Sequence, residues 1–107
     1  MSELNELYEV VMSRKENFEE GSYTCYLFDK GLDKILKKVG EESAETIIAA
    51  KNGDKEEIVN ETSDLLYHLT VMLAQCGVPY SDVEAELKRR SAKIGNLKKM
   101  RVTDKNT

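Results

Sequence analysis

The sequence predicts an all-α fold: an antiparallel helical bundle of four to five helices in a single domain, residues 1–107, completed by homodimerisation. Proline occurs once in the 107 residues, so little interrupts a helix. Apolar residues recur at helical spacing, and alternating runs typical of strands are few. The length suits one domain, and a chain this short gains from association because it buries a limited core by itself.

The first helix is expected over about residues 2–18. Its apolar side chains follow the i, i+3, i+4, i+7 spacing of a single helix face: Leu4, Leu7, Tyr8 and Val11. The segment Glu-Glu-Gly-Ser at 19–22 interrupts this pattern. Residues 23–30 are compatible with either a short helix or an ordered loop, and the sequence leaves both open.

The second helix is expected over about residues 32–51 and should end at Asn52-Gly53, a common helix terminus. One arc of it carries Leu32, Ile35, Leu36, Val39, Thr46 and Ala50. A third helix should begin after Asp54, which can cap it, and run to about residue 76. The main apolar face of the third helix comprises Leu65, Leu66, Leu69, Met72 and Leu73. Val71 and Ala74 lie off that face, which favours contact with more than one neighbour and hence a homodimer.

A fourth, shorter helix is expected over about residues 82–93, with Ser81 as its cap. The polar residues after about 96 are expected to form a frayed tail. Short loops separate the last three helices, and such loops usually join antiparallel neighbours.

The carboxylates on the second and third expected helices form the patterns Glu41-Glu42-x-x-Glu45 and Glu61-x-x-Asp64. Residues three apart lie on nearly the same helix face. Two neighbouring helices would therefore gather these acids, and carboxylates about 5 Å apart repel by ~3 kcal/mol at an effective dielectric near 20. Oxygen ligands alone favour a hard divalent ion, which predicts a Mg²⁺ site, with Mn²⁺ as the alternative.

A plainer interpretation is that these acids are surface charges, neutralised by lysines one turn away as in Lys38–Glu42. On the third helix this interpretation fails, because no lysine occurs between Lys55 and Lys88. His68 follows one turn after the last acid, where it could hydrogen-bond a metal ligand or simply fill the bundle.

The chemistry that fits this pattern is metal-assisted phosphoryl or nucleotidyl transfer to water. Glu41 is a candidate to orient or deprotonate the water, while Lys34 and Lys38 could bind outer phosphates. The net charge of −4 argues against general nucleic-acid binding, which needs a basic face. The sequence has no signal peptide and no apolar run of membrane-spanning length, so a cytoplasmic protein is expected.

The acidic pattern resembles that of the all-α NTP pyrophosphatase superfamily, which includes MazG-like enzymes and dimeric dUTPases. Three segments are further similar to the phosphoribosyl-ATP pyrophosphatase family: SYTCYLF at 22–28, GLDKILKKVGEE at 31–42 and DLLYHL at 64–69. The resemblance spans about residues 4–90. It implies Mg²⁺-dependent hydrolysis of phosphoribosyl-ATP to phosphoribosyl-AMP and pyrophosphate, the second step of histidine biosynthesis, by a homodimer or higher homo-oligomer.

The resemblance also implies roles for individual residues. The metal ligands would be Glu42, Glu45, Glu61 and Asp64, which together with Glu41 form the catalytic set. Substrate-facing roles would fall to Ser22, Tyr23, Thr24, Lys34 and Lys38. The segment after the fourth helix lacks the Ser-Gly pair that family members often carry, which leaves Arg90, Lys93 and Arg101 as candidate phosphate contacts.

Two other functions remain compatible with the sequence. The first is a house-cleaning (d)NTP pyrophosphatase, which would have the same fold and a different substrate. The second is a non-catalytic helical interaction module whose acids bind a metal only for stability.

Overall fold

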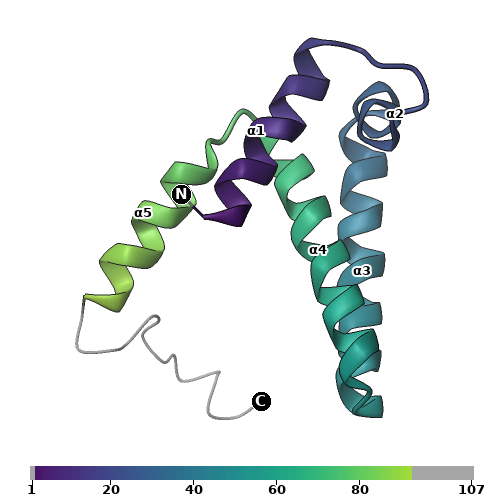
Figure 1. Ribbon diagram of the computed structural model, residues 1–107, viewed down its shortest axis with the longest axis vertical. Coiled ribbons are helices and arrows are strands. Elements are labelled where there is room, and N and C mark those ends of the chain that lie inside the picture. The colour runs from purple at the N-terminus through teal and green to yellow at the C-terminus, as the bar shows by residue number, and fades with distance from the viewer. Residues whose placement is uncertain (1, 93–107) are drawn as a thin grey trace.

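The computed structural model describes residues 2–92 and contains five helices, with no strand in that part of the chain. The helices are α1 (Glu3–Glu16), α2 (Tyr23–Lys30), α3 (Leu32–Asn52), α4 (Lys55–Gln75) and α5 (Tyr80–Ser91) (Figure 1). The prediction of an all-α fold is confirmed. No described helix combines the length and the apolar character of a membrane span. The tail expected after residue 96, and the candidate phosphate contacts Lys93 and Arg101, lie outside the described residues.

Side-chain caps explain where most of these helices begin. Ser22 accepts a hydrogen bond from the backbone N–H of Cys25 at 3.2 Å, and this cap makes the ambiguous segment 23–30 a helix. Asp54 caps α4 as predicted, because its carboxylate accepts from the N–H groups of Glu56 and Glu57. The prediction that Ser81 caps the last helix is wrong. That helix begins at Tyr80, directly after Pro79, whose fixed φ suits a helix start.

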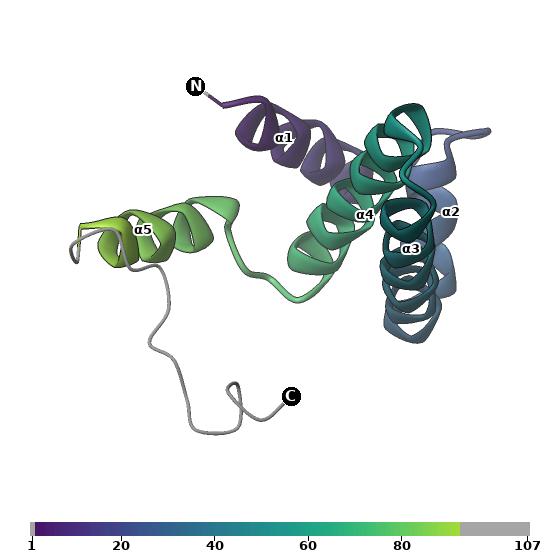
Figure 2. The same ribbon diagram turned by 90° about the horizontal axis from the view of Figure 1, so that it is seen from below.

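Helices α3 and α4 form the long antiparallel pair at the centre of the fold, and they lie side by side in both views (Figures 1 and 2). Gly53 joins them in the left-handed conformation, with φ of +71°, which a glycine adopts without steric cost. Helix α1 packs on α4, and α2 packs mainly on α3 and α1. The last helix does not run along α4 as its short loop predicted. Helix α5 packs chiefly against α1 and extends away from the α3–α4 pair (Figure 2).

The core lies where α1, α2, α3 and α4 meet. Its largest fully buried side chains come one from each of these helices: Val11, Leu27, Ile35 and Val71. On α4 the buried face is the one carrying Val71 and Ala74, whereas Leu66 on the predicted main face is 38% exposed. Helix α4 is apolar around much of its circumference, so its contacts with α1 and α2 decide which face turns inward.

Several large apolar side chains remain exposed on the α3–α4 pair. Ile47 is 65% exposed and Ile48 is 58% exposed on α3, and Val59 on α4 is 54% exposed. Scattered exposed apolar residues are ordinary on a protein surface.

Candidate active site

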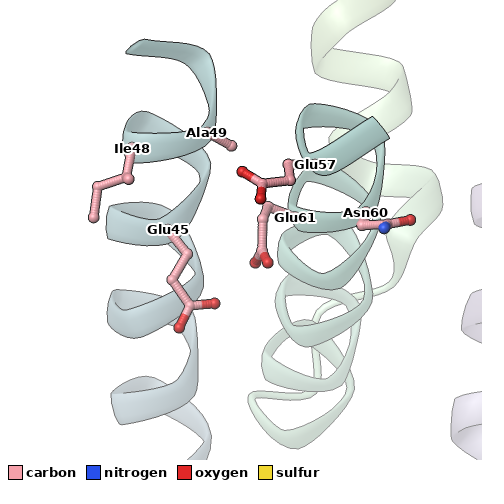
Figure 3. Close-up of a pocket in the computed structure, with 6 residues that line it drawn as sticks. All are labelled: Glu45, Ile48, Ala49, Glu57, Asn60 and Glu61. Atoms are coloured by element: carbon pink, nitrogen blue, oxygen red, sulfur yellow. The ribbon is translucent and has the colours of Figure 1, made fainter. Parts of the chain in front are cut away.

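Three acidic side chains converge between α3 and α4. Glu42 and Glu45 come from α3 and Glu61 from α4, and each contributes a carboxylate oxygen that lies within 4.8 Å of the other two. We call these three residues the acid cluster. Figure 3 shows Glu45 and Glu61 facing each other across the space between the two helices. The structure thus brings together three of the four predicted metal ligands.

The acid cluster is partly shielded from water. Glu42 is only 7% exposed, although charged side chains are rarely buried without a partner. The Oε2 atoms of Glu42 and Glu61 are both buried, and neither has a hydrogen-bond partner among the described residues. Buried polar atoms are normally hydrogen-bonded, so two unpartnered carboxylate oxygens in one cluster require an explanation. A hard divalent cation such as Mg²⁺ or Mn²⁺ fits this all-oxygen set of donors.

Mutual repulsion and burial change the acidity of the cluster. The pKa of Glu61 is raised from 4.5 to about 7, first by its hydrogen bond with Glu45, then by burial and by the nearby Glu42. The pKa of Glu42 is also raised, mainly by burial, with the charges of Glu45 and Asp64 adding to the effect. Without a cation, the cluster therefore keeps a proton at pH values at which isolated carboxyl groups are ionised.

This shift predicts how the stability of the metal-free protein depends on pH. The folded-state pKa of Glu61 is about 7 and lies above its unfolded value of 4.5, so the folded state binds more protons between these two values. The contribution of Glu61 to the free energy of unfolding is therefore fully present below pH 4.5, and it is lost as the pH rises through about 7. Urea unfolding in EDTA at several pH values should show this loss. The loss should be smaller in Glu61→Gln, and identical pH profiles for the two proteins would contradict the assignment.

The two remaining predicted acids lie beside the cluster. Asp64 is exposed one turn after Glu61, and its charge reaches Glu42. Glu41 is exposed and forms an ion pair with Lys38 at 3.5 Å. The i, i+4 pair Lys38–Glu42 is not among the ion pairs of the described residues, and Glu42 turns to the acid cluster instead.

A groove of about 210 Å³ opens next to the acid cluster. Its lining, drawn in Figure 3, consists of Glu45, Ile48, Ala49, Glu57, Asn60 and Glu61. Glu57 points toward α3 in this view, whereas Asn60 turns away from it. Neither Glu57 nor Asn60 is a predicted site residue. The position of Glu57, one turn before Glu61 on the same face of α4, is the signal that could have identified it.

Tyr23 connects α2 to the acid-bearing part of α4. Its hydroxyl lies 3.1 Å from Nε2 of His68, whose Nδ1 lies 2.8 Å from the backbone carbonyl oxygen of Asp64. A carbonyl oxygen only accepts, so Nδ1 carries the proton, and Nε2 accepts from the Tyr23 hydroxyl. His68 is 4% exposed and therefore acts here as a buried link between Tyr23 and the backbone beside the acids.

The other predicted substrate residues differ in their placement. Ser22 caps α2, and Thr24 forms a hydrogen bond with the hydroxyl of Tyr67, a residue that the sequence did not indicate. Lys34 is half-buried one turn before Lys38 on α3. Arg90 bonds Glu86 at 2.9 Å on α5, which the fold holds away from the α3–α4 pair (Figure 2). A single chain therefore does not bring Arg90 to the acid cluster.

Comparison with known proteins places this geometry in a family. The sequence model of the family described as phosphoribosyl-ATP pyrophosphohydrolase matches residues 4–91. The chain belongs to the phosphoribosyl-ATP pyrophosphohydrolase family. The matched region contains the acid cluster, Tyr23 and His68, so the site described above lies wholly within the part of the chain that defines the family.

Several relatives in this family cover nearly the whole chain. A phosphoribosyl-ATP pyrophosphatase of Streptococcus thermophilus is 62% identical over 94 residues, which span 88% of this chain and 90% of the relative. One from Listeria monocytogenes is 58% identical over 89% of this chain and 91% of its own length. One from Clostridium novyi is 50% identical over 89% of this chain and 86% of its own length.

Proposed function

We propose that this chain hydrolyses phosphoribosyl-ATP to phosphoribosyl-AMP and pyrophosphate, the second step of histidine biosynthesis, with Mg²⁺ as cofactor and Mn²⁺ as a possible substitute. The observation that carries the proposal is the acid cluster. It places two buried, unpartnered carboxylate oxygens on facing helices, in a chain that belongs to the phosphoribosyl-ATP pyrophosphohydrolase family. Burying charged oxygens without partners lowers the free energy of unfolding unless a cation neutralises their charge.

In this proposal Glu42, Glu45 and Glu61 hold the cation, with Asp64 as a further ligand. When bound, the cation supplies charge neutralisation at phosphate oxygens. Lys38 contributes a second positive charge beside the cluster. Desolvation alone would lower its pKa, but the neighbouring Tyr23, Glu41 and Glu42 raise the pKa overall, so it stays protonated. Glu41, exposed on the same helix as Glu42 and Glu45, takes the proton from the attacking water. The water oxygen bonds to phosphorus as the α–β phosphoanhydride bond breaks, and pyrophosphate leaves.

The direct test is release of pyrophosphate from phosphoribosyl-ATP by the purified protein with Mg²⁺. We expect EDTA to stop the release and an excess of Mg²⁺ to restore it. A panel of canonical and damaged deoxynucleoside triphosphates, assayed in parallel, tests the alternative substrate class. No release from phosphoribosyl-ATP by folded protein, or faster hydrolysis of a deoxynucleoside triphosphate, would overturn the proposal.

We also propose that the active species is a homodimer, built on the exposed apolar surface of α3 and α4. Ile47, Ile48 and Val59 are all more than half exposed on this helix pair, and a second copy would remove them from water. Sedimentation of the wild type should give twice the monomer mass, whereas Val59→Asp should sediment as a monomer, because a charge at the interface loses its hydration.

The matched control is Leu87→Asp, at an equally exposed apolar position on α5, outside the proposed interface. It should leave the sedimentation coefficient unchanged. A wild-type monomer at micromolar concentration would contradict the dimer.

A further inference from the structure

A second hollow, of about 470 Å³, opens beside the start of α2, and the acid cluster does not account for it. We call it the aromatic pocket, and it is lined by Phe18, Gly21, Ser22, Tyr23, Tyr26 and Asp29. Its volume is typical of small-molecule sites. We propose that the aromatic pocket binds the purine base of the substrate, with Tyr26 as the stacking surface and Tyr23 as a positioning residue. This inference rests on the proposed function.

The aromatic rings of the pocket are unusually open to solvent. Phe18 is 73% exposed, Tyr23 is 46% exposed and Tyr26 is 41% exposed. The rings of Tyr23 and Tyr26 are nearly parallel, with centroids 6.0 Å apart and planes inclined by 22°. Partly exposed aromatic rings around a hollow suit a planar heterocycle, because every nucleobase presents a π-face that can stack.

Tyr23 contacts both the aromatic pocket and residues beside the acid cluster. Its ring lines the pocket, while its hydroxyl bonds the buried His68, which is held in turn by the backbone of Asp64. The pKa of Tyr23 is raised mainly by burial, while the Lys38 charge opposes the rise and the Glu42 charge adds to it. The hydroxyl thus lies within the electrostatic field of the acid cluster. In this proposal, a nucleotide whose phosphates lie at the acid cluster places its base in the aromatic pocket.

Two charged side chains near the pocket, one acidic and one basic, also suit the polar groups of a purine nucleotide. The Asp29 carboxylate lines the pocket and can accept a hydrogen bond from an exocyclic N–H of an aminopurine. The next residue of α2 is Lys30, whose ammonium lies 5.8 Å from the centroid of the Tyr26 ring. Phosphoribosyl-ATP carries a second phosphorylated ribose on its base, and Lys30 offers a positive charge beside Tyr26 for that group.

Tyr26→Leu tests the stacking surface, because it removes the aromatic ring and retains apolar volume. We expect KM for phosphoribosyl-ATP to rise about tenfold, with kcat changed less than about twofold, as for the loss of one base-stacking ring. Tyr26→Phe keeps the ring and should retain the wild-type KM. Leu87→Ala, on α5 and outside both sites, should change neither constant.

A second measurement starts from the wild type, and its first result does not depend on any variant folding. Saturation of tyrosine ring protons should transfer to the purine protons of adenosine 5′-monophosphate, and the transfer should weaken in Tyr26→Leu. An unchanged KM in Tyr26→Leu, or no transfer in the wild type, would overturn the purine pocket and leave hydrolysis standing. No hydrolysis by the wild type would overturn both proposals. Dissociation of an oligomer by Tyr26→Leu would assign the pocket to an interface between copies and also overturn this proposal.

Discussion

Glu42→Gln is expected to lower pyrophosphate release from phosphoribosyl-ATP by about a thousandfold, as for the loss of a charged group that organises the transition state. Glutamine keeps the size of the side chain and removes its negative charge. The buried Oε2 atom of Glu42, which has no hydrogen-bond partner among residues 2–92, becomes part of a neutral amide that binds a cation poorly. The measurement is kcat at saturating Mg²⁺, together with calorimetry of Mg²⁺ uptake.

The stability of the metal-free variant separates this effect from unfolding. In EDTA, Glu42→Gln should unfold at the same urea concentration as the wild type or at a higher one, because the substitution relieves repulsion among the clustered carboxylates. Glu9→Gln, at an exposed position on α1, is the matched control and should retain full activity. Full activity in Glu42→Gln would refute the role of the acid cluster. Loss of metal-dependent stabilisation, with no turnover even in the wild type, would favour the non-catalytic module.

Leu27→Ala is expected to destabilise the protein by about 3 kcal/mol, within the range for truncating a buried leucine. Leu27 is 0% exposed and holds α2 against the core. Helix α2 has only eight residues, too few to be stable without packing. For a domain of this size the melting temperature should fall by roughly 15 °C, measured by circular dichroism with saturating Mg²⁺.

Leu87→Ala removes the same atoms from an exposed position and serves as the control. Leu87 is 48% exposed on α5, so the change in unfolding free energy should stay within about 0.5 kcal/mol. Equal effects of the two substitutions would show that α2 is not anchored as described. Because α2 also carries Tyr23, we further expect Leu27→Ala to raise KM for phosphoribosyl-ATP.

Local signals in the sequence were sufficient for most helix boundaries. Asp54 begins α4 as predicted, and Gly53 ends α3, because capping depends on residues a few positions apart. Helix α5 begins at Tyr80, earlier than a Ser81 cap predicts, because the fixed φ of Pro79 suits a helix start. The sequence does not decide between a helix and a loop for residues 23–30, because their apolar pattern is too short to identify a helix.

The buried face of α4 shows where sequence reasoning fails. The row of leucines beginning at Leu65 looks like the core-facing side, yet Val71 and Ala74 are the residues that α4 buries completely. Periodicity shows that a helix has apolar faces, but it does not show which face meets which neighbour when the apolar arc is wide. As a result, Leu66 on the predicted face stays 38% exposed.

Spacing within a few turns of the chain predicts most of the helices and the row of acids along one side of α3 and of α4. The packing of these helices brings Glu42, Glu45 and Glu61 together and leaves Glu41 and Asp64 beside them. The link from Tyr23 to His68 likewise appeared only in the fold. These contacts join residues on different helices, and their geometry depends on how α2, α3 and α4 pack and rotate against one another, which no local pattern encodes.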